Sequence, residues 1–153
     1  MLSLAGVAHA QHATQDDGKS YSPIYCTRTF NDASAAPYWV FPWGFLNNSA
    51  ADMYVSCPIV KDEELSLTGL SYAAVNVTNP KGSTTRCSIY SLDAAANHIL
   101  DWRGAETSLA GFQTLFLSPY PAKSDYYGMY GILCRLPPQG WLRSYTIYEK
   151  LGR

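Results

Sequence analysis

Strict alternation of apolar and polar residues is the feature that most restricts how this chain can fold. Within Tyr126–Leu136, Tyr130, Ile132, Cys134 and Leu136 recur at every second position. Side chains of an extended strand point alternately to the two sides of a sheet, so this spacing turns one apolar side toward a core. Other segments repeat the pattern, namely Asp52–Val60, Leu65–Thr78 and Thr85–Ser91.

Turn residues divide the rest of the chain into further short segments rich in β-branched and aromatic residues. These candidate strands are Tyr21–Phe30, Tyr38–Leu46, Asn97–Arg103, Leu109–Leu117 and Trp141–Lys150. Only Leu92–Leu100 could form a short helix or turn, and the connections are too short for crossover helices. We therefore expect an all-β fold, an antiparallel β-sandwich of immunoglobulin-like or jelly-roll type with about eight strands.

The chain begins with an uncharged, mostly apolar segment, Met1–Ala10, that ends in Ala8-His9-Ala10. A small-x-small motif where the chain turns polar is typical of a signal-peptide cleavage site, although the usual basic start is missing. The alternative is a short disordered apolar tail. We expect a signal-peptide remnant at 1–10, a flexible polar arm at 11–20 and a single β-sandwich domain at 21–153. The predicted location is periplasmic or extracellular.

The chain has four cysteines, and their wide spacing predicts disulfide bonds rather than a metal site. Cys87 and Cys134 each lie in the middle of a strand, on its apolar side, where they could meet across the core. Their pairing leaves Cys26 to bond Cys57. The two other pairings remain open, as do buried thiols.

Composition excludes several classes of function. The 153 residues include 11 Lys and Arg against 12 Asp and Glu, so no basic surface for nucleic acid is expected. No apolar run reaches the length of a membrane span. Phosphate-binding loops and calcium-loop spacing are absent from the sequence, so we predict no cofactor and no metal site.

Catalytic residues are not recognisable in the sequence either. His98 lacks the sequence context of a catalytic triad, and the carboxylates Asp101, Glu106, Glu63 and Glu64 cannot be placed opposite one another from the sequence. We therefore expect no enzymatic activity, with a small secreted hydrolase as an alternative.

Aromatic side chains are concentrated between Tyr38 and Phe45, where Trp39, Phe41 and Trp43 would share one side of a strand with Phe45. Such rings can form a core or stack on sugars and protein partners. Trp43 lies between Pro42 and Gly44 and is expected to project from the surface. The candidate ligand-binding residues are Trp39, Trp43, Trp102, Trp141, Asn47 and Asn48.

Several elements together resemble small exported bacterial proteins of unassigned function. They are Gly44–Ser49, Val55–Val60, Cys87–Ile89, Cys134–Pro137 and Ser144–Glu149. The resemblance implies a secreted β-sandwich and no catalytic residue, and it does not include the aromatic segment.

The function expected from the sequence is that of a secreted, non-catalytic binding or surface-associated module. Its partner would be a carbohydrate or a protein. An alternative is a structural subunit that assembles in an envelope or an extracellular fibre. The sequence leaves the oligomeric state undetermined.

Overall fold

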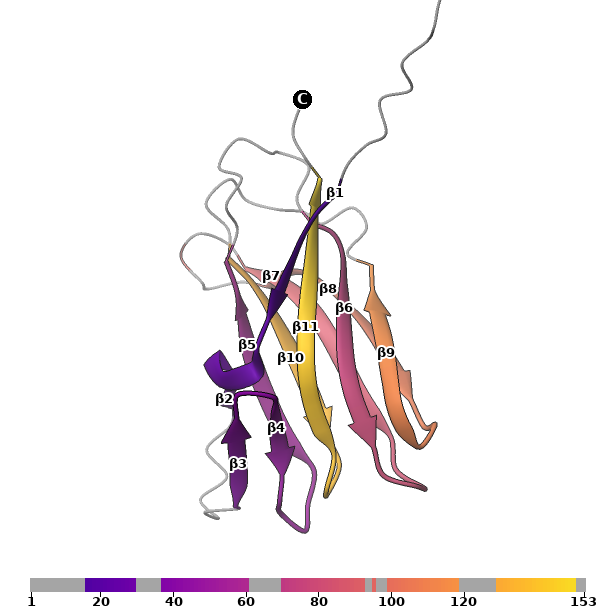
Figure 1. Ribbon diagram of the computed structural model, residues 1–153. Coiled ribbons are helices and arrows are strands. Elements are labelled where there is room, and N and C mark those ends of the chain that lie inside the picture. The colour runs from indigo at the N-terminus through magenta and orange to yellow at the C-terminus, as the bar shows by residue number, and fades with distance from the viewer. Residues whose placement is uncertain are drawn as a thin grey trace, which may run out of the picture.

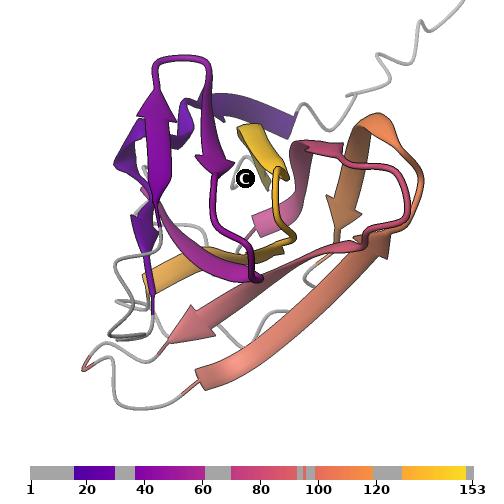
Figure 2. The ribbon, with the colours of Figure 1, turned by 90° about the horizontal axis from the view of Figure 1, so that it is seen from below.

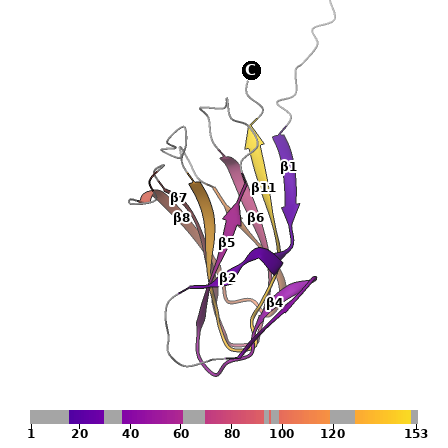
Figure 3. The same cartoon turned by 90° about the vertical axis from the view of Figure 1, so that its left-hand side faces the viewer.

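Two antiparallel β-sheets packed face to face form the protein (Figure 1). The computed structural model describes residues 16–29, 37–60, 70–92, 95, 99–118 and 129–150. In these ranges no helix is long and apolar enough to cross a membrane. Figure 3 shows the two layers from the side, with β7 and β8 in one layer and β1 and β11 in the other.

One sheet contains six strands in the described part of the chain. Its path is β3-β4-β11-β6-β9, and β1 pairs with the second half of β11. The strands are β1 (Asp16–Tyr21), β3 (Tyr38–Phe41), β4 (Gly44–Asn47), β6 (Leu70–Asn79), β9 (Gly111–Leu117) and β11 (Trp141–Lys150). Seen along the strands, the hairpin of β3 and β4 lies at the edge of the sandwich (Figure 2).

The other sheet contains five strands within the described ranges, in the order β2-β5-β10-β7-β8. The strands are β2 (Thr27–Arg28), β5 (Met53–Ile59), β7 (Thr85–Leu92), β8 (Ile99–Thr107) and β10 (Met129–Leu136). A short 3-10 helix, η1 (Pro23–Tyr25), precedes β2.

The pairing of the last eight strands is nested. β4 pairs with β11, β5 with β10, β6 with β9 and β7 with β8, all antiparallel. This is the pairing of one long hairpin rolled into two sheets, so the fold is a jelly roll rather than an immunoglobulin-like sandwich. The expected all-β sandwich is confirmed, with more strands than the eight or so predicted, because the hairpin at Pro42 divides one segment and short strands form near the N-terminus.

The core lies between the sheets and is filled by the predicted apolar sides of the strands. On β5 and β10 every second residue is buried, from Met53 to Ile59 and from Tyr130 to Leu136. On β11 the register shifts between Leu142 and Ser144, which marks a β-bulge. The bulge lets Leu142 and Tyr145, three positions apart, both enter the core.

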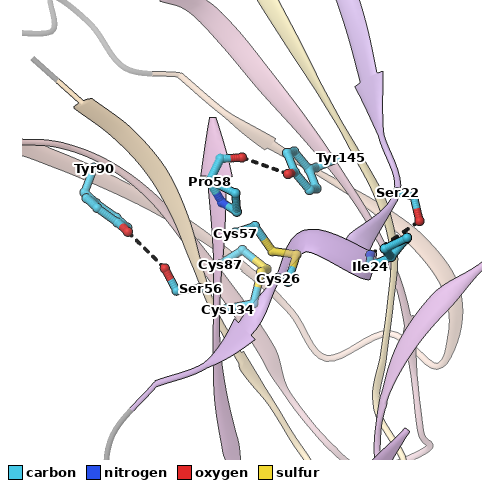
Figure 4. Close-up of a disulfide and its surroundings, with 10 residues drawn as sticks. All are labelled: Ser22, Ile24, Cys26, Ser56, Cys57, Pro58, Cys87, Tyr90, Cys134 and Tyr145. Carbon is cyan, nitrogen blue, oxygen red and sulfur yellow. Dashed lines mark hydrogen bonds between the residues drawn. A yellow bond between two sulfur atoms is a disulfide. The ribbon is translucent and has the colours of Figure 1, made fainter. Parts of the chain in front are cut away.

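Both disulfide bonds have the predicted partners, Cys26 with Cys57 and Cys87 with Cys134 (Figure 4). The predicted geometry of the second bond was wrong. Cys87 and Cys134 lie directly opposite each other on the neighbouring strands β7 and β10, with 4.0 Å between their Cα atoms. The bond therefore joins two strands of one sheet and does not cross the core.

Near the N-terminus the structure differs from the sequence prediction. Residues Asp16–Tyr21 were expected mostly in a flexible arm, yet they form β1. Backbone pairing with β11 does not require apolar side chains, and Lys19 Nζ lies 3.2 Å from Glu149 Oε2. The signal-peptide prediction at 1–10, His98 and most of the expected helix or turn at Leu92–Leu100 lie outside the described residues.

Tyr145 connects the two sheets through a polar contact inside the core. Its hydroxyl donates a hydrogen bond of 2.8 Å to the carbonyl oxygen of Pro58 on β5 (Figure 4). Its ring stacks on Tyr21 with 5.1 Å between centroids. Burial, with a smaller contribution from Tyr21, raises the pKa of Tyr145 to about 12 from 10.0.

This shift predicts a specific loss of stability at high pH. The stabilisation associated with the raised pKa is fully present below pH 10 and is lost as the pH rises through 12, because the unfolded phenol ionises first. Tyr145→Phe lacks this loss, although at neutral pH it should be about 1 kcal/mol less stable than the wild type. Urea unfolding of both proteins from pH 9 to 12 should show that the difference between their free energies of unfolding narrows. A constant difference would contradict the raised pKa of Tyr145.

Candidate functional site

The fold separates the four tryptophans onto the two outer faces of the sandwich. Trp39 and Trp141 lie on the outer face of the six-stranded sheet, since both are opposite Leu46 in the register. Trp43 stacks with them through Phe41. Trp102 is on β8, on the outer face of the five-stranded sheet. The sequence prediction named all four as candidate ligand-binding residues without placing them on one surface, and the structure distributes them over two.

On the six-stranded sheet the rings form a cluster that we call the aromatic stack, comprising Trp39, Phe41, Trp43, Trp141 and Arg143. Phe41 stacks on Trp43 at 5.2 Å and on Trp141 at 5.8 Å, and Trp39 meets it edge-on at 6.2 Å. The Arg143 guanidinium lies 4.1 Å from the Trp141 ring centroid. The ring faces of Phe41 and Trp141 are thus largely occupied by their neighbours.

Backbone features of the β3–β4 hairpin build this stack. Pro42 and Trp43 form the two-residue turn, so Trp43 leaves the strand ladder as predicted and is 61% exposed. A Cβ atom at Gly44 would lie 2.9 Å from the Trp141 ring, so the absence of a side chain at Gly44 leaves room for that ring beside the hairpin. Phe45, expected on the same side as Trp43, is instead fully buried in the core.

The two candidate asparagines support the loop that follows β4. Asn47 is fully buried, and its amide donates to the carbonyl oxygens of Ala51 and Leu136 and accepts from Ser49. We therefore leave Asn47 out of the candidate site as a correction to the sequence prediction. Asn48 is half-buried and accepts a 3.1 Å hydrogen bond from Gln139.

The outer face of the five-stranded sheet carries a hollow of about 390 Å³, which we call the outer trough. Trp102 and Ile99 are its most exposed members, at 52% and 65%. The lining residues are Thr29, Ser56, Ser88, Tyr90, Leu92, Ile99, Trp102 and Leu133. Hydroxyl groups and aromatic surface therefore meet in one concave site on the sheet.

Small residues create the floor of the outer trough. A Cβ atom at Gly131 would collide with the Tyr90 ring, so the glycine lets Tyr90 lie across β10. The Tyr90 hydroxyl then reaches Ser56 on β5 at 3.0 Å (Figure 4). Beside Trp102, a Cβ atom at Gly104 would lie 2.9 Å from Ser88 Oγ.

A smaller hollow of about 180 Å³, the arginine hollow, adjoins the outer trough. It is lined by Tyr54, Arg86, Ser88, Leu133 and Arg135, and two of these residues also line the trough. The Arg86 guanidinium lies 5.7 Å from the Trp102 ring centroid.

Two of the carboxylates considered for a hydrolase are described, and the structure does not bring them together. Asp101 and Glu106 lie an odd number of residues apart on β8, so they point to opposite sides of the sheet. Asp101 forms an ion pair of 2.9 Å with Arg103. Glu63, Glu64 and His98 lie outside the described residues, and in the described part no group of three potential metal ligands occurs.

Comparisons with known proteins show distant structural likeness alone. No protein-family model and no curated protein matches the chain. An isomalto-dextranase of Arthrobacter globiformis T6 complexed with panose is 12% identical at a TM-score of 0.48, over 85% of this chain and 23% of that one. A GH26-CBM35 β-(1,4)-mannanase of Podospora anserina is 9% identical at 0.48, over 91% of this chain and 29% of that one.

The family 11 carbohydrate-binding module of the cellulosomal cellulase Lic26A-Cel5E of Clostridium thermocellum is similar in length. It is 7% identical at a TM-score of 0.46, over 99% of this chain and 97% of that one. The chain spans less than a third of the first two enzymes. The TM-scores of these three proteins are all below 0.5, so no functional role is carried over from them to this chain.

Sequence reasoning missed most residues of the outer trough. It identified Trp102 but not Tyr90, Ser56 or the two glycines. A signal was present, since Gly131 and Gly104 interrupt strand segments and glycine within a strand often marks a close approach. The sequence could not indicate which side chain approaches.

The exposure of Trp43 predicts a small effect on stability. Trp43→Ala should lower the free energy of unfolding by about 0.5–1.5 kcal/mol, the loss expected for a surface stacking contact. The matched variant Phe45→Ala, two residues away but fully buried, should lower it by about 3–5 kcal/mol. Urea unfolding measures both, and equal losses would place Trp43 in the core.

Proposed function

We propose that this protein is an exported, non-catalytic carbohydrate-binding module and that the outer trough binds the sugar. The observation that carries the proposal is the exposed ring of Trp102 beside a concave floor of aromatic and hydroxyl groups. The volume of about 390 Å³ lies within the range of about 300–1,000 Å³ common for small-molecule sites.

The chemistry of the lining suits a sugar ring. The apolar C–H face of a pyranose can stack on an aromatic ring such as Trp102, while its hydroxyls exchange hydrogen bonds with Ser56 and Ser88. Tyr90 is held by Ser56 at 3.0 Å, so the floor is organised before a ligand binds.

Export is part of the proposal. Disulfide bonds persist in oxidising compartments, and both bonds of this chain therefore support a periplasmic or extracellular location. The small-x-small motif at Ala8-His9-Ala10 supports the same conclusion from the sequence.

Replacing Trp102 tests the proposed site. Trp102→Ala should weaken binding of the best ligand from a polysaccharide panel by about 2 kcal/mol or more, roughly thirtyfold in Kd, because it removes the main stacking surface. Isothermal titration measures the affinity. Trp43→Ala is the matched control, a tryptophan of similar exposure on the opposite face.

The pair of variants distinguishes the two outer faces. Loss of binding in Trp102→Ala with wild-type affinity in Trp43→Ala supports the outer trough. The reverse pattern would move the ligand to the aromatic stack, and unchanged affinity in both would refute a tryptophan-based site.

One observation favours a second candidate function, self-assembly of a structural subunit. Strand β3 is the end of the six-stranded sheet and pairs only with β4 among the described strands. Tyr38, Trp39 and Val40 are each more than 40% exposed, and no charged residue occurs from Pro37 to Ala51. Apolar edges without charge are prone to pair with another chain.

A charge on this edge should prevent such assembly. Val40→Lys places a lysine on β3, a common protection of natural edge strands, and should turn any oligomer into a monomer. Light scattering after size-exclusion chromatography measures the mass of wild type and variant. A wild-type protein that stays monomeric at high concentration would contradict this candidate.

A further inference from the structure

Two arginines face each other on the outer side of the five-stranded sheet. Arg135 on β10 lies directly opposite Arg86 on β7 in the strand register. Residues in such positions have Cβ atoms about 4.5–5.5 Å apart, and like charges placed there destabilise a sheet. An anion between the two guanidinium groups would therefore reduce their repulsion.

Carboxylates of the protein compensate the pair only in part. Asp52 Oδ2 lies 3.5 Å from Arg135 Nε, where both side chains are well exposed. On β8, the other neighbour of β7, Glu106 lies directly opposite Arg86 in the strand register. Within the described ranges, however, Arg86 makes no ion pair, and its guanidinium is directed over Trp102 at 5.7 Å.

The two guanidinium groups open onto the same space. Both arginines line the arginine hollow of about 180 Å³, and no acidic residue is among the residues that line it. Ser88 and Leu133 also line the outer trough, so the two hollows adjoin each other. A ligand that extends from the trough into the arginine hollow would therefore present part of its length to both arginines.

We infer that the outer trough binds an acidic polysaccharide, with an anionic group of one sugar held between Arg86 and Arg135 while a neighbouring sugar stacks on Trp102. This inference rests on the proposed carbohydrate-binding function and specifies its ligand class. The planar guanidinium group matches the geometry of a carboxylate or a sulfate ester and can bind it through two parallel hydrogen bonds. Neutral glycans would leave the like charges compensated only in part, by Asp52 beside Arg135.

The test compares polymers that differ in charge alone. Polygalacturonate and alginate supply carboxylates, and a sulfated galactan supplies sulfate esters. Each is paired with its neutral form, prepared by carboxyl reduction or desulfation. Titration of the full chain should give at least tenfold tighter binding to an acidic polymer than to its neutral form, and the polymer that binds distinguishes carboxylate from sulfate.

Variants connect the preference to the two arginines. Arg86→Gln and Arg135→Gln should each weaken acidic binding by about 10- to 100-fold, as expected for lost hydrogen bonds to a charged group, and this loss should be larger than any change in binding of the neutral form. Lys81→Gln, an exposed lysine in the β6–β7 turn, is the control for net charge. Arg86→Gln should unfold at the same or a higher urea concentration than wild type, because a like-charge contact is removed.

The outcomes test the acidic preference and the carbohydrate-binding function separately. Equal binding of acidic and neutral polymers, unaffected by the arginine variants, would overturn the acidic preference and leave the carbohydrate-binding function in place. An equal loss of acidic binding in Lys81→Gln would reduce the effect to general attraction and also overturn it. If the wild type binds no polysaccharide of the panel, both the function and its ligand class fail.

Discussion

Each strand of a two-layer sandwich has to bury one side and leave the other to water, and this division organises the whole molecule. On β7, the inner side carries Cys87 and Ile89 while the outer side carries Arg86, Ser88 and Tyr90. The inner side supplies the apolar contacts that stabilise the fold. The outer side is released from packing and can carry arginine, serine and tyrosine in the arrangement that forms the outer trough.

The alternation along the strands could be read from the sequence because it is local. It correctly predicted which sides of β5, β7 and β10 are buried. The order of strands within the sheets depends on contacts between distant segments and could not be read. The correct cysteine pairing was consequently predicted for a partly wrong reason, since Cys87 and Cys134 share a sheet.

How the candidate ligand-binding residues are grouped in space could not be read from the sequence for the same reason. Trp39, Trp43 and Trp102 are similar in sequence terms, but nested pairing sends the first two to one face and the third to the other. The sequence suggested Asn47 as a ligand-binding residue because it follows an aromatic segment. In the structure its amide is buried and holds the loop after β4 through hydrogen bonds. Side-chain accessibility in a sandwich depends on which neighbour lies opposite, and that neighbour is distant in the chain.

The position of the disulfide bonds has a mechanical consequence. One bond joins β7 to β10 within the five-stranded sheet, and the other joins β5 of that sheet to Cys26, the residue just before β2. Among the described residues, the six-stranded sheet has no disulfide bond and is held by hydrogen bonds, packing and the ion pair of Lys19 with Glu149. The two covalent bonds would therefore resist separation of β7 from β10, and of β5 from the segment before β2, in the layer that carries the trough.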